Sequence, residues 1–458
     1  DISELINNHD FNSLLVRLVD ELKTDNLPKR YQACKIGDLH NSVENILTGI
    51  GYLPENENES ESKSSENLDS FLNNVLNLAY TTFGNQPDFA SRQTLHELAA
   101  LINKVSDENL YNLLRLIAVV STKHEKNRVN LYHSGFFTNL DKFLSKKFKN
   151  TGENDDIRLS SEKLLHNKIL GQLCRTLRRF CVDDDPRETS VRAHDNARDL
   201  VNDANMLERL CRFLEKIDSN NFKLKKEIIM TLSKLLVRNE FCLKAADQSC
   251  GLLELIESNL QICVSENEEK DAENNANANA QGDGATPQEI VLLKPLLILL
   301  KAVCGNDEVK YRVSQNHQLC ENIVENGNKF GTDANIAEAV LACSHVITLR
   351  QPEMCEFFAK LSIAHTCINL MELHKEQRKV MLNGCMLIRN MVARTRHLQK
   401  SFLELDVESL LNEICVSYKM DTNVLQAARA AQRDLDLDAN LSEQWRGQPG
   451  QSHEIAYD

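Results

Sequence analysis

The fold is decided by a stretch that recurs along the chain, which in residues 110–147 reads LYNLLRLIAVVSTKHEKNRVNLYHSGFFTNLDKFLSKK. An apolar helix comes first, followed by the polar turn Lys123–Asn127, a short helix, the break Ser134-Gly135 and another amphipathic helix. Apolar residues at helical spacing predict one buried face on each helix. The stretch therefore predicts helices that cannot bury their apolar faces alone and must stack on neighbours.

The same layout returns in four further stretches, each with its polar turn at the same place. They are residues 226–261, 292–330, 337–374 and 380–418, with turns that begin at Arg238, Gly305, Arg350 and Arg394. The last two turns begin 44 positions apart, a period typical of three-helix repeats. The sequence therefore predicts an all-α solenoid of about seven three-helix repeats with helical caps.

Polar segments divide this solenoid. We expect an N-terminal helical cap over residues 1–53, an acidic disordered loop over 54–68 and three-helix repeats over 69–263. An acidic, Asn-rich disordered insert over 264–287, further repeats over 288–435 and a polar C-terminal tail over 436–458 follow. Both inserts hold too little apolar surface to offset the entropy of ordering them.

Composition agrees with helices rather than strands. Of 458 residues 42% are hydrophobic but only 5% aromatic, with 16 Gly and 8 Pro, whereas sheets favour aromatic and β-branched residues. The net charge of −14 is concentrated in residues 55–69, 151–162, 265–289 and 434–458, which together hold −19. The repeat body is therefore mildly basic, near +5.

The 14 cysteines lie along apolar helical stretches and form no Cys-x-x-Cys pair, so we expect reduced, packed thiols and a cytoplasmic location, with the nucleus as an alternative. The most apolar run, 290–304, is too short for a bilayer, which needs about 20 apolar residues. No phosphate-binding Gly-rich loop, nucleophile elbow or His-Glu-x-x-His motif occurs. The sequence therefore predicts no enzyme, no cofactor, no metal site, no small-molecule substrate and no membrane partner.

Seven blocks of sequence resemble the armadillo-repeat family. They are 84–88 (GNQPD), 123–128 (KHEKNR), 183–185 with 193–194, 238–242 (RNEFC), 305–307 (GND), 385–390 (CMLIRN) and 445–448 (WRGQ). The resemblance implies a curved right-handed superhelix that binds partner proteins without catalysis. The family's small break before each second helix survives at Ser134-Gly135, whereas Gln248–Cys250, Ala364-His365 and Leu405-Asp406 replace it elsewhere, so we expect those joints to differ in shape.

In this family the third helix of each repeat lines the concave groove, and here that is the helix before each polar turn. These helices and turns are basic, and the candidate groove residues are Arg175, Arg178, Arg179, Lys234, Arg238, Lys301, Arg389, Asn390 and Arg394. Guanidinium groups suit carboxylates, so we predict that the groove accepts an extended acidic segment of a protein partner. The resemblance to nuclear-import adaptors is weak, because their groove Asn positions correspond to Val119, Arg179, Lys234, Ala302, Val346 and Asn390, and the sole Trp, Trp445, lies in the tail.

Two further interpretations stay open: an adaptor that holds a folded client for transport or chaperoning, and an RNA-binding solenoid. The second is less favoured because the basic helices lack interleaved aromatic residues for base stacking. The block Asp183-Asp184-Asp185-Pro186-Arg187, with His194 following, is the most unusual local sequence. It has the residue types of a metal or acid–base site, but helix capping is the favoured interpretation.

Overall fold

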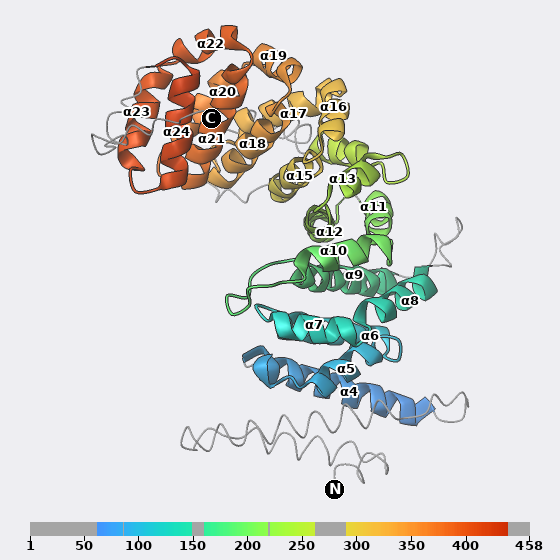
Figure 1. Ribbon diagram of the computed structural model, residues 1–458. Helices are drawn as coiled ribbons and strands as arrows, with labels where there is room; N and C mark the ends of the chain where they lie inside the picture. The colour runs from blue at the N-terminus through green and yellow to red at the C-terminus, as the bar shows by residue number, and fades with distance from the viewer. Residues whose placement is uncertain (1–61, 86, 149–159, 219, 262–289, 438–458) are drawn as a thin grey trace, which may run out of the picture. The chain divides into compact units, whose positions relative to one another are not determined.

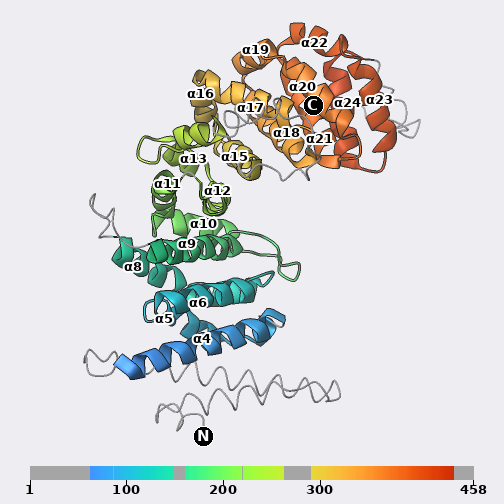
Figure 2. The same cartoon turned by 180° about the vertical axis from the view of Figure 1, so that it is seen from behind.

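The computed structural model describes residues 62–85, 87–148, 160–218, 220–261 and 290–437, and Figures 1 and 2 show it from opposite sides. Every regular element in these residues is a helix, so the predicted all-α class is confirmed. The chain divides into two compact units, Asp1–Gly251 and Leu252–Asp458, called unit 1 and unit 2.

Unit 1 contains both short and long helices. In chain order they are α4 (Ser62–Asn85), η1 (Pro87–Phe89), α5 (Arg92–Leu101), α6 (Asp107–Val120), α7 (Glu125–His133), α8 (Phe136–Phe148), α9 (Ser160–Phe180), α10 (Ala193–Asn202), α11 (Met206–Lys216), α12 (Phe222–Leu235) and α13 (Asn239–Ala246). The helices group into the triplets η1–α5–α6, α7–α8–α9 and α10–α11–α12, each ending in a long helix.

Unit 2 repeats the arrangement after a helix over residues 252–261. Its elements are α15 (Ile290–Val303), α16 (Asp307–Gln315), α17 (His317–Phe330), α18 (Ala334–Thr348), α19 (Pro352–Lys360), α20 (Ile363–Leu373), α21 (Arg378–Ala393), η2 (Arg396–Leu398), α22 (Gln399–Leu403), α23 (Val407–Ser417) and α24 (Thr422–Asp434). The triplets here are α16–α17–α18, α19–α20–α21 and η2/α22–α23–α24.

The last helix of each triplet, which we call the third helix, stacks on the third helix of the next triplet. In unit 1, α4 packs on α6, α6 on α9 and α9 on α12; in unit 2, α15 packs on α18, α18 on α21 and α21 on α24 (Figure 1). Leu116 of α6, Leu232 of α12 and Leu387 of α21 are completely buried in these stacks. Burying one such side chain contributes about 1.5–3 kcal/mol, so stacking stabilises every triplet through its neighbours.

At most joints between the first and second helices of a triplet the connecting residue is in the left-handed conformation; at the α16–α17 joint it is not, because Asn316 has φ −100°. Gly135 (φ 79°) precedes α8 and Gly251 (φ 55°) precedes the helix over 252–261. Asn205 (φ 48°), Ser362 (φ 60°) and Asp406 (φ 54°) hold the same place before α11, α20 and α23. The expectation of differently shaped joints was therefore wrong at these positions, because non-glycine residues adopt the strained conformation themselves.

Several predicted segments differ from the structure or lie outside its described residues. The cap over 1–53, the insert over 264–287 and residues 438–458 of the tail lie outside. Of the loop predicted over 54–68, residues 62–68 instead form the first turns of α4, and residues 54–61 lie outside the described residues. The number of about seven repeats stays a prediction, because the stretch between α12 and α15 is divided between the units.

Every cysteine among the described residues is a free thiol, and all of these except Cys415 are buried. Burial raises the pKa of Cys174 and of Cys367 to about 12, so these thiols stay protonated and unreactive. None of the described helices combines the length and apolarity that crossing a bilayer requires.

The sign of the change in stability on substitution tests the left-handed joints. An added methyl at Gly135 would touch no other heavy atom within 4 Å, so Gly135→Ala measures backbone strain alone. We expect Gly135→Ala to lower the free energy of unfolding by about 1–2 kcal/mol, and Ser362→Gly to raise it by a similar amount. The control Gly171→Ala, inside α9 with its added methyl at an ordinary 3.6 Å from Leu224 Cδ1, should instead stabilise by helix propensity. Thermal melting of the three variants checks these signs; equal effects at Gly135 and Gly171 would contradict the assignment.

Candidate functional site

The candidate cations of unit 1 lie on two adjacent third helices. Arg175, Arg178 and Arg179 are on α9, and Lys234 is on α12. Arg238 stands apart at the N-terminus of α13, where it faces Glu240 at 3.5 Å. The structure therefore brings four of these five residues together on one surface.

One carboxylate holds two of these arginines. Glu227 of α12 accepts a hydrogen bond from Arg175 Nε at 2.9 Å and forms an ion pair with Arg178. Arg178 also donates to the backbone oxygen of Glu227 at 2.7 Å and to Thr231 Oγ1 at 3.1 Å. Burial raises the pKa of Glu227, but the hydrogen bonds and charges of Arg178 and Arg175 lower it by more. The pKa of Glu227 therefore lies below its ordinary value. Arg178 thus cross-links α9 to α12.

The two remaining cations of this surface are available. Arg179 and Lys234 are exposed and have no acidic partner among the described residues. Such side chains keep their full charge at the surface, where they can attract a carboxylate from another molecule. Arg179 and Lys234 therefore place free positive charge at the C-terminal ends of α9 and α12.

Unit 2 divides its candidates between α15 and α21, which flank α18. Lys301 of α15 and Arg394, the residue after α21, are exposed and unpaired within the described part of the chain. Arg389 donates from Nε to Asp434 of α24 at 3.1 Å. Asn390 donates from Nδ2 to the backbone oxygen of His345 at 2.6 Å, so its amide ties α21 to α18.

The acidic block at 183–187 forms a polar cluster with the turn before α7. Arg128 of α7 is completely buried and donates from Nε to Ser121 O at 2.8 Å and from Nη1 to Val182 O at 2.7 Å. The same guanidinium forms ion pairs with Glu125, at 3.0 Å, and with Asp184. A buried charge needs such complete pairing, so this cluster joins two successive turns of unit 1.

Asp185 extends the cluster to a third turn. It accepts a hydrogen bond from the backbone N–H of Glu125 at 2.8 Å and pairs with Arg187 at 2.9 Å. Arg187 reaches Asp88 at 2.9 Å, and His124 Nε2 lies 2.7 Å from the same carboxylate. The bonds from Arg187 hold the pKa of Asp185 well below its ordinary value, against the effect of burial. Asp184 and Asp185 are engaged by arginines, and Asp185 accepts from the first N–H of α7. The predicted capping of the helix that follows the block was wrong, because α10 begins only at Ala193 and has no side-chain cap.

A metal site is not supported in this cluster. No group of three His, Cys, Asp or Glu side chains in the described ranges is arranged to hold a metal ion. His194 is exposed on α10 and forms no ion pair with these acids.

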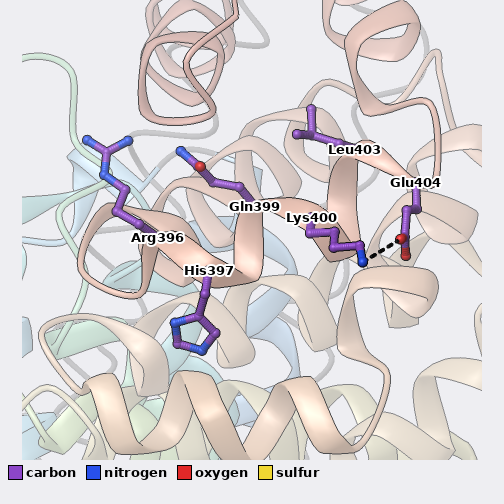
Figure 3. Close-up of a pocket in the computed structure, with 6 residues that line it drawn as sticks. All are labelled: Arg396, His397, Gln399, Lys400, Leu403 and Glu404. Atoms are coloured by element: carbon purple, nitrogen blue, oxygen red, sulfur yellow. Dashed lines mark ion pairs between the residues drawn. The ribbon is translucent and has the colours of Figure 1, made fainter.

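A shallow hollow of about 510 Å³ lies beside η2 and α22 in unit 2 (Figure 3). Its lining includes the basic residues Arg396, His397 and Lys400. Each faces an acid: Arg396 lies 3.4 Å from Asp436, His397 2.8 Å from Glu356, and Lys400 3.7 Å from Glu404. The hollow is therefore charge-balanced and offers less to an anion than the third helices do.

No family model matches the chain. Two curated relatives are 28% identical to it over 280 residues, which is 61% of this chain and 49% of each relative. They are armadillo repeat-containing protein 6 of Pongo abelii and of Homo sapiens. The chain resembles armadillo repeat-containing protein 6. It spans about half the length of these relatives.

A solved structure of an engineered protein aligns over 92% of this chain and 99% of its own, with a TM-score of 0.50 and 13% identity. At that identity the likeness shows the fold alone. The predicted resemblance to armadillo-repeat proteins is confirmed by the relatives, and the solenoid by the structure. The nine candidate residues stay a prediction.

The armadillo likeness does not extend to a row of groove asparagines. Of the positions compared with the import adaptors only Asn390 is Asn, and its Nδ2 is engaged by α18. Trp445 lies outside the described residues. The structure thus adds a reason to set the import-adaptor interpretation aside.

Sequence reasoning missed one cation of the same surface. Arg115 of α6 lies 4.3 Å above the ring of Tyr80 and 5.7 Å from that of Tyr111, and both tyrosines are half-buried. On the same helices Asn112 Nδ2 donates to Asn73 Oδ1 at 2.7 Å. The sequence did carry a signal for Arg115. The pattern of buried residues on α6 matches that on α9, and in this match Arg115 takes the place of Arg175.

The buried guanidinium gives a direct stability test. Arg128→Ala leaves Glu125 and Asp184 without their buried partner, so we expect a loss of about 3–5 kcal/mol in urea unfolding. The matched control Arg179→Ala removes an exposed, unpaired arginine and should change stability by less than about 0.5 kcal/mol. Similar losses in both variants would contradict the cluster's role.

Acid should weaken the same cluster. Because the pKa of Asp185 is lower in the folded chain than in the unfolded chain, its carboxylate stabilises the fold above its ordinary pKa of 3.8 and loses this effect as the pH falls below it. Asp185→Asn should therefore be less stable than the native chain at pH 7, with a difference that shrinks from about pH 5 toward pH 2. Urea midpoints measured across this range check the trend, and a constant difference would refute it.

Proposed function

We propose that this protein is a non-enzymatic interaction scaffold that binds a partner polypeptide along its third helices, and that the bound segment is extended and acidic. The observation that carries the proposal is the set of exposed cations without acidic partners in the described residues. Among the candidate residues these are Arg179 and Lys234 in unit 1 and Lys301 and Arg394 in unit 2. In unit 1 they lie at the ends of the stacked helices α9 and α12, and in unit 2 at the ends of α15 and α21, which flank α18, so an elongated ligand on either unit would meet two of them.

The chemistry of these side chains supports a carboxylate-rich ligand. Guanidinium groups bind carboxylates through two parallel hydrogen bonds, and ammonium groups add a compact positive charge. Exposed charges of this kind increase the association rate and the specificity more than the affinity, and salt weakens them. A scaffold of this design should bind moderately and with clear dependence on ionic strength.

Glu227 supports the proposal from inside the chain. Its carboxylate already occupies the place between Arg175 and Arg178 that an acidic ligand would take. Arg178 keeps its bonds to Glu227 O and Thr231 if this carboxylate is removed, so α9 and α12 stay joined. The side chain of Glu227 therefore acts as an internal competitor for the ligand.

An RNA-binding role is the second candidate, and one observation favours it. Tyr80 of α4 and Tyr111 of α6 flank Arg115, and α6 packs on α9, which carries Arg175 and Arg179. Aromatic rings and arginines together can stack bases. Against this, both rings are half-buried and already contact Arg115, so an extended polypeptide remains the better-supported ligand.

Two opposite charge changes test the acidic ligand. With a fluorescein-labelled Asp/Glu-rich peptide, Glu227→Gln should tighten binding several-fold because it releases Arg175, whereas Arg179→Glu with Lys234→Glu should weaken it about tenfold or more. Glu215→Gln, an exposed change on α11, is the matched control and should have no effect. Fluorescence anisotropy at two salt concentrations gives the affinities.

The same titrations separate the candidates. Failure of Glu227→Gln and of the double variant to move peptide affinity in opposite directions would refute the acidic-segment proposal. Salt-sensitive binding of a random RNA oligonucleotide, without peptide binding, would favour the second candidate. A pull-down with the native chain beside the double variant would then identify a partner that depends on this surface.

A further inference from the structure

Two thiols of unit 1 contact each other directly. Cys211 lies on α11 and Cys250 ends the turn over residues 247–250, and the Cys211 thiol donates a hydrogen bond to the sulfur of Cys250. By contrast, Cys320 and Cys355 donate to the backbone oxygens of residues 313 and 348, at 3.9 and 3.7 Å. Cys211 and Cys250 therefore form a pair of sulfurs, which these other thiols do not.

A neighbouring ion pair holds the two elements that carry the sulfurs. Glu208, three residues before Cys211 and on the same face of α11, lies 3.1 Å from Lys244 of α13. After α13 the chain reaches Cys250 through a tight turn, in which the N–H of Cys250 donates to Asp247 O at 3.0 Å. The ion pair and the turn together keep the two sulfurs in contact.

The two thiols differ in access and in charge. Cys250 is 6% exposed and follows the exposed residues 247–249, whereas Cys211 is only 1% exposed. The hydrogen bond from Cys211 lowers the pKa of Cys250 against the effect of burial, and the charge of Lys244 lowers it further. The same bond, together with burial, raises the pKa of Cys211. The thiolate is the reactive form of cysteine, so Cys250 reacts first and Cys211 waits beside it as a second thiol.

We propose that Cys250 and Cys211 are a redox modification site, at which a hydroperoxide converts the two thiols into a disulfide. Attack by the Cys250 thiolate on the peroxide forms a sulfur–oxygen bond and breaks the oxygen–oxygen bond, so that Cys250 becomes a sulfenic acid. The Cys211 sulfur then attacks the sulfur of Cys250, the disulfide bond forms, and the sulfur–oxygen bond breaks with loss of water. With hydrogen peroxide, two thiols and one peroxide give one disulfide and two water molecules, and the two sulfurs supply both electrons.

The disulfide would act as a reversible clip within unit 1. It joins the triplet α10–α11–α12 to the turn after α13, and the loop that it closes contains α12 and α13. A cross-link of this kind restricts the unfolded chain more than the folded one. Oxidation should therefore oppose opening of this part of the stack, a property separate from the ligand proposed above.

Peptide mapping of the full chain tests the site. The native chain is treated with a small molar excess of hydrogen peroxide, its remaining thiols are alkylated with iodoacetamide in denaturant, and its peptides are identified by mass spectrometry without a reductant. We expect a linked pair of peptides that joins Cys211 to Cys250, formed at least about tenfold faster than any other buried cysteine is oxidised. Dithiothreitol should remove the link.

Three variants assign the roles of the two thiols. Cys211→Ala leaves no second thiol, so the sulfenic acid of Cys250 should persist and be trapped by dimedone, whereas Cys250→Ala should abolish oxidation of Cys211. Cys242→Ala, the same change at a buried thiol of α13, is the matched control and should keep the link. By circular dichroism, the oxidised native chain should melt several degrees above the reduced chain, and peroxide should not raise the melting temperature of Cys250→Ala.

Two results would overturn the proposal. One is that Cys211 and Cys250 both remain thiols in the folded chain under peroxide that oxidises free glutathione. The other is that the link forms at a rate that rises in proportion to the unfolded fraction in urea, since the disulfide would then be a product of unfolding. Neither result bears on the proposed scaffold function, which the peptide titrations test separately.

Discussion

The structure depends on the burial of each third helix between the third helices before and after it. Leu116, Leu232 and Leu387 are inaccessible only because a neighbouring triplet covers them. No triplet of this kind is stable alone, and its surface chemistry is free to vary once its buried side is satisfied. Because the buried side supplies the stability, the buried positions of α15, α18, α21 and α24 keep one register, whereas the exposed positions are free to vary from apolar to basic.

A second constraint acts through polar groups rather than apolar ones. In unit 1 the buried Arg128 and the capping Asp185 join three turns, whereas in unit 2 single contacts such as Asn390 to His345 O join one helix to the next. Buried ion pairs add little net stability but penalise any arrangement that separates them. We expect this cluster to fix the geometry of the turns in unit 1 and so the positions of the cations on α9.

Much of the fold could be predicted from the sequence because its signals are local. The turn at Asn306, the apolar spacing of α12 and the 44-residue period depend on neighbours in the chain. The left-handed Ser362 and Asp406 could not be predicted, because neither residue type demands a positive φ. Their conformation is imposed by the two helices that each of them joins.

The candidate site was less predictable because it depends on contacts between repeats. Nothing in the sequence pairs Arg178 with Glu227, 49 positions away, or indicates that Arg179 beside it stays free. Asn390 matched a ligand-binding position, yet its amide is held by a backbone oxygen 45 positions earlier. Composition could show that the third helices are basic; only the stacked arrangement shows which charges are unpaired.

The buried thiols have a consequence for how the chain comes apart. Cys174, Cys211 and Cys320 lie in three different triplets, Cys367 and Cys385 share a fourth, and each is sheltered from solvent. A stack held by contacts between neighbours opens piece by piece, and an alkylating reagent reaches a thiol only when its own piece has opened. The order in which these sulfurs become modified would therefore be a map of local opening within each unit.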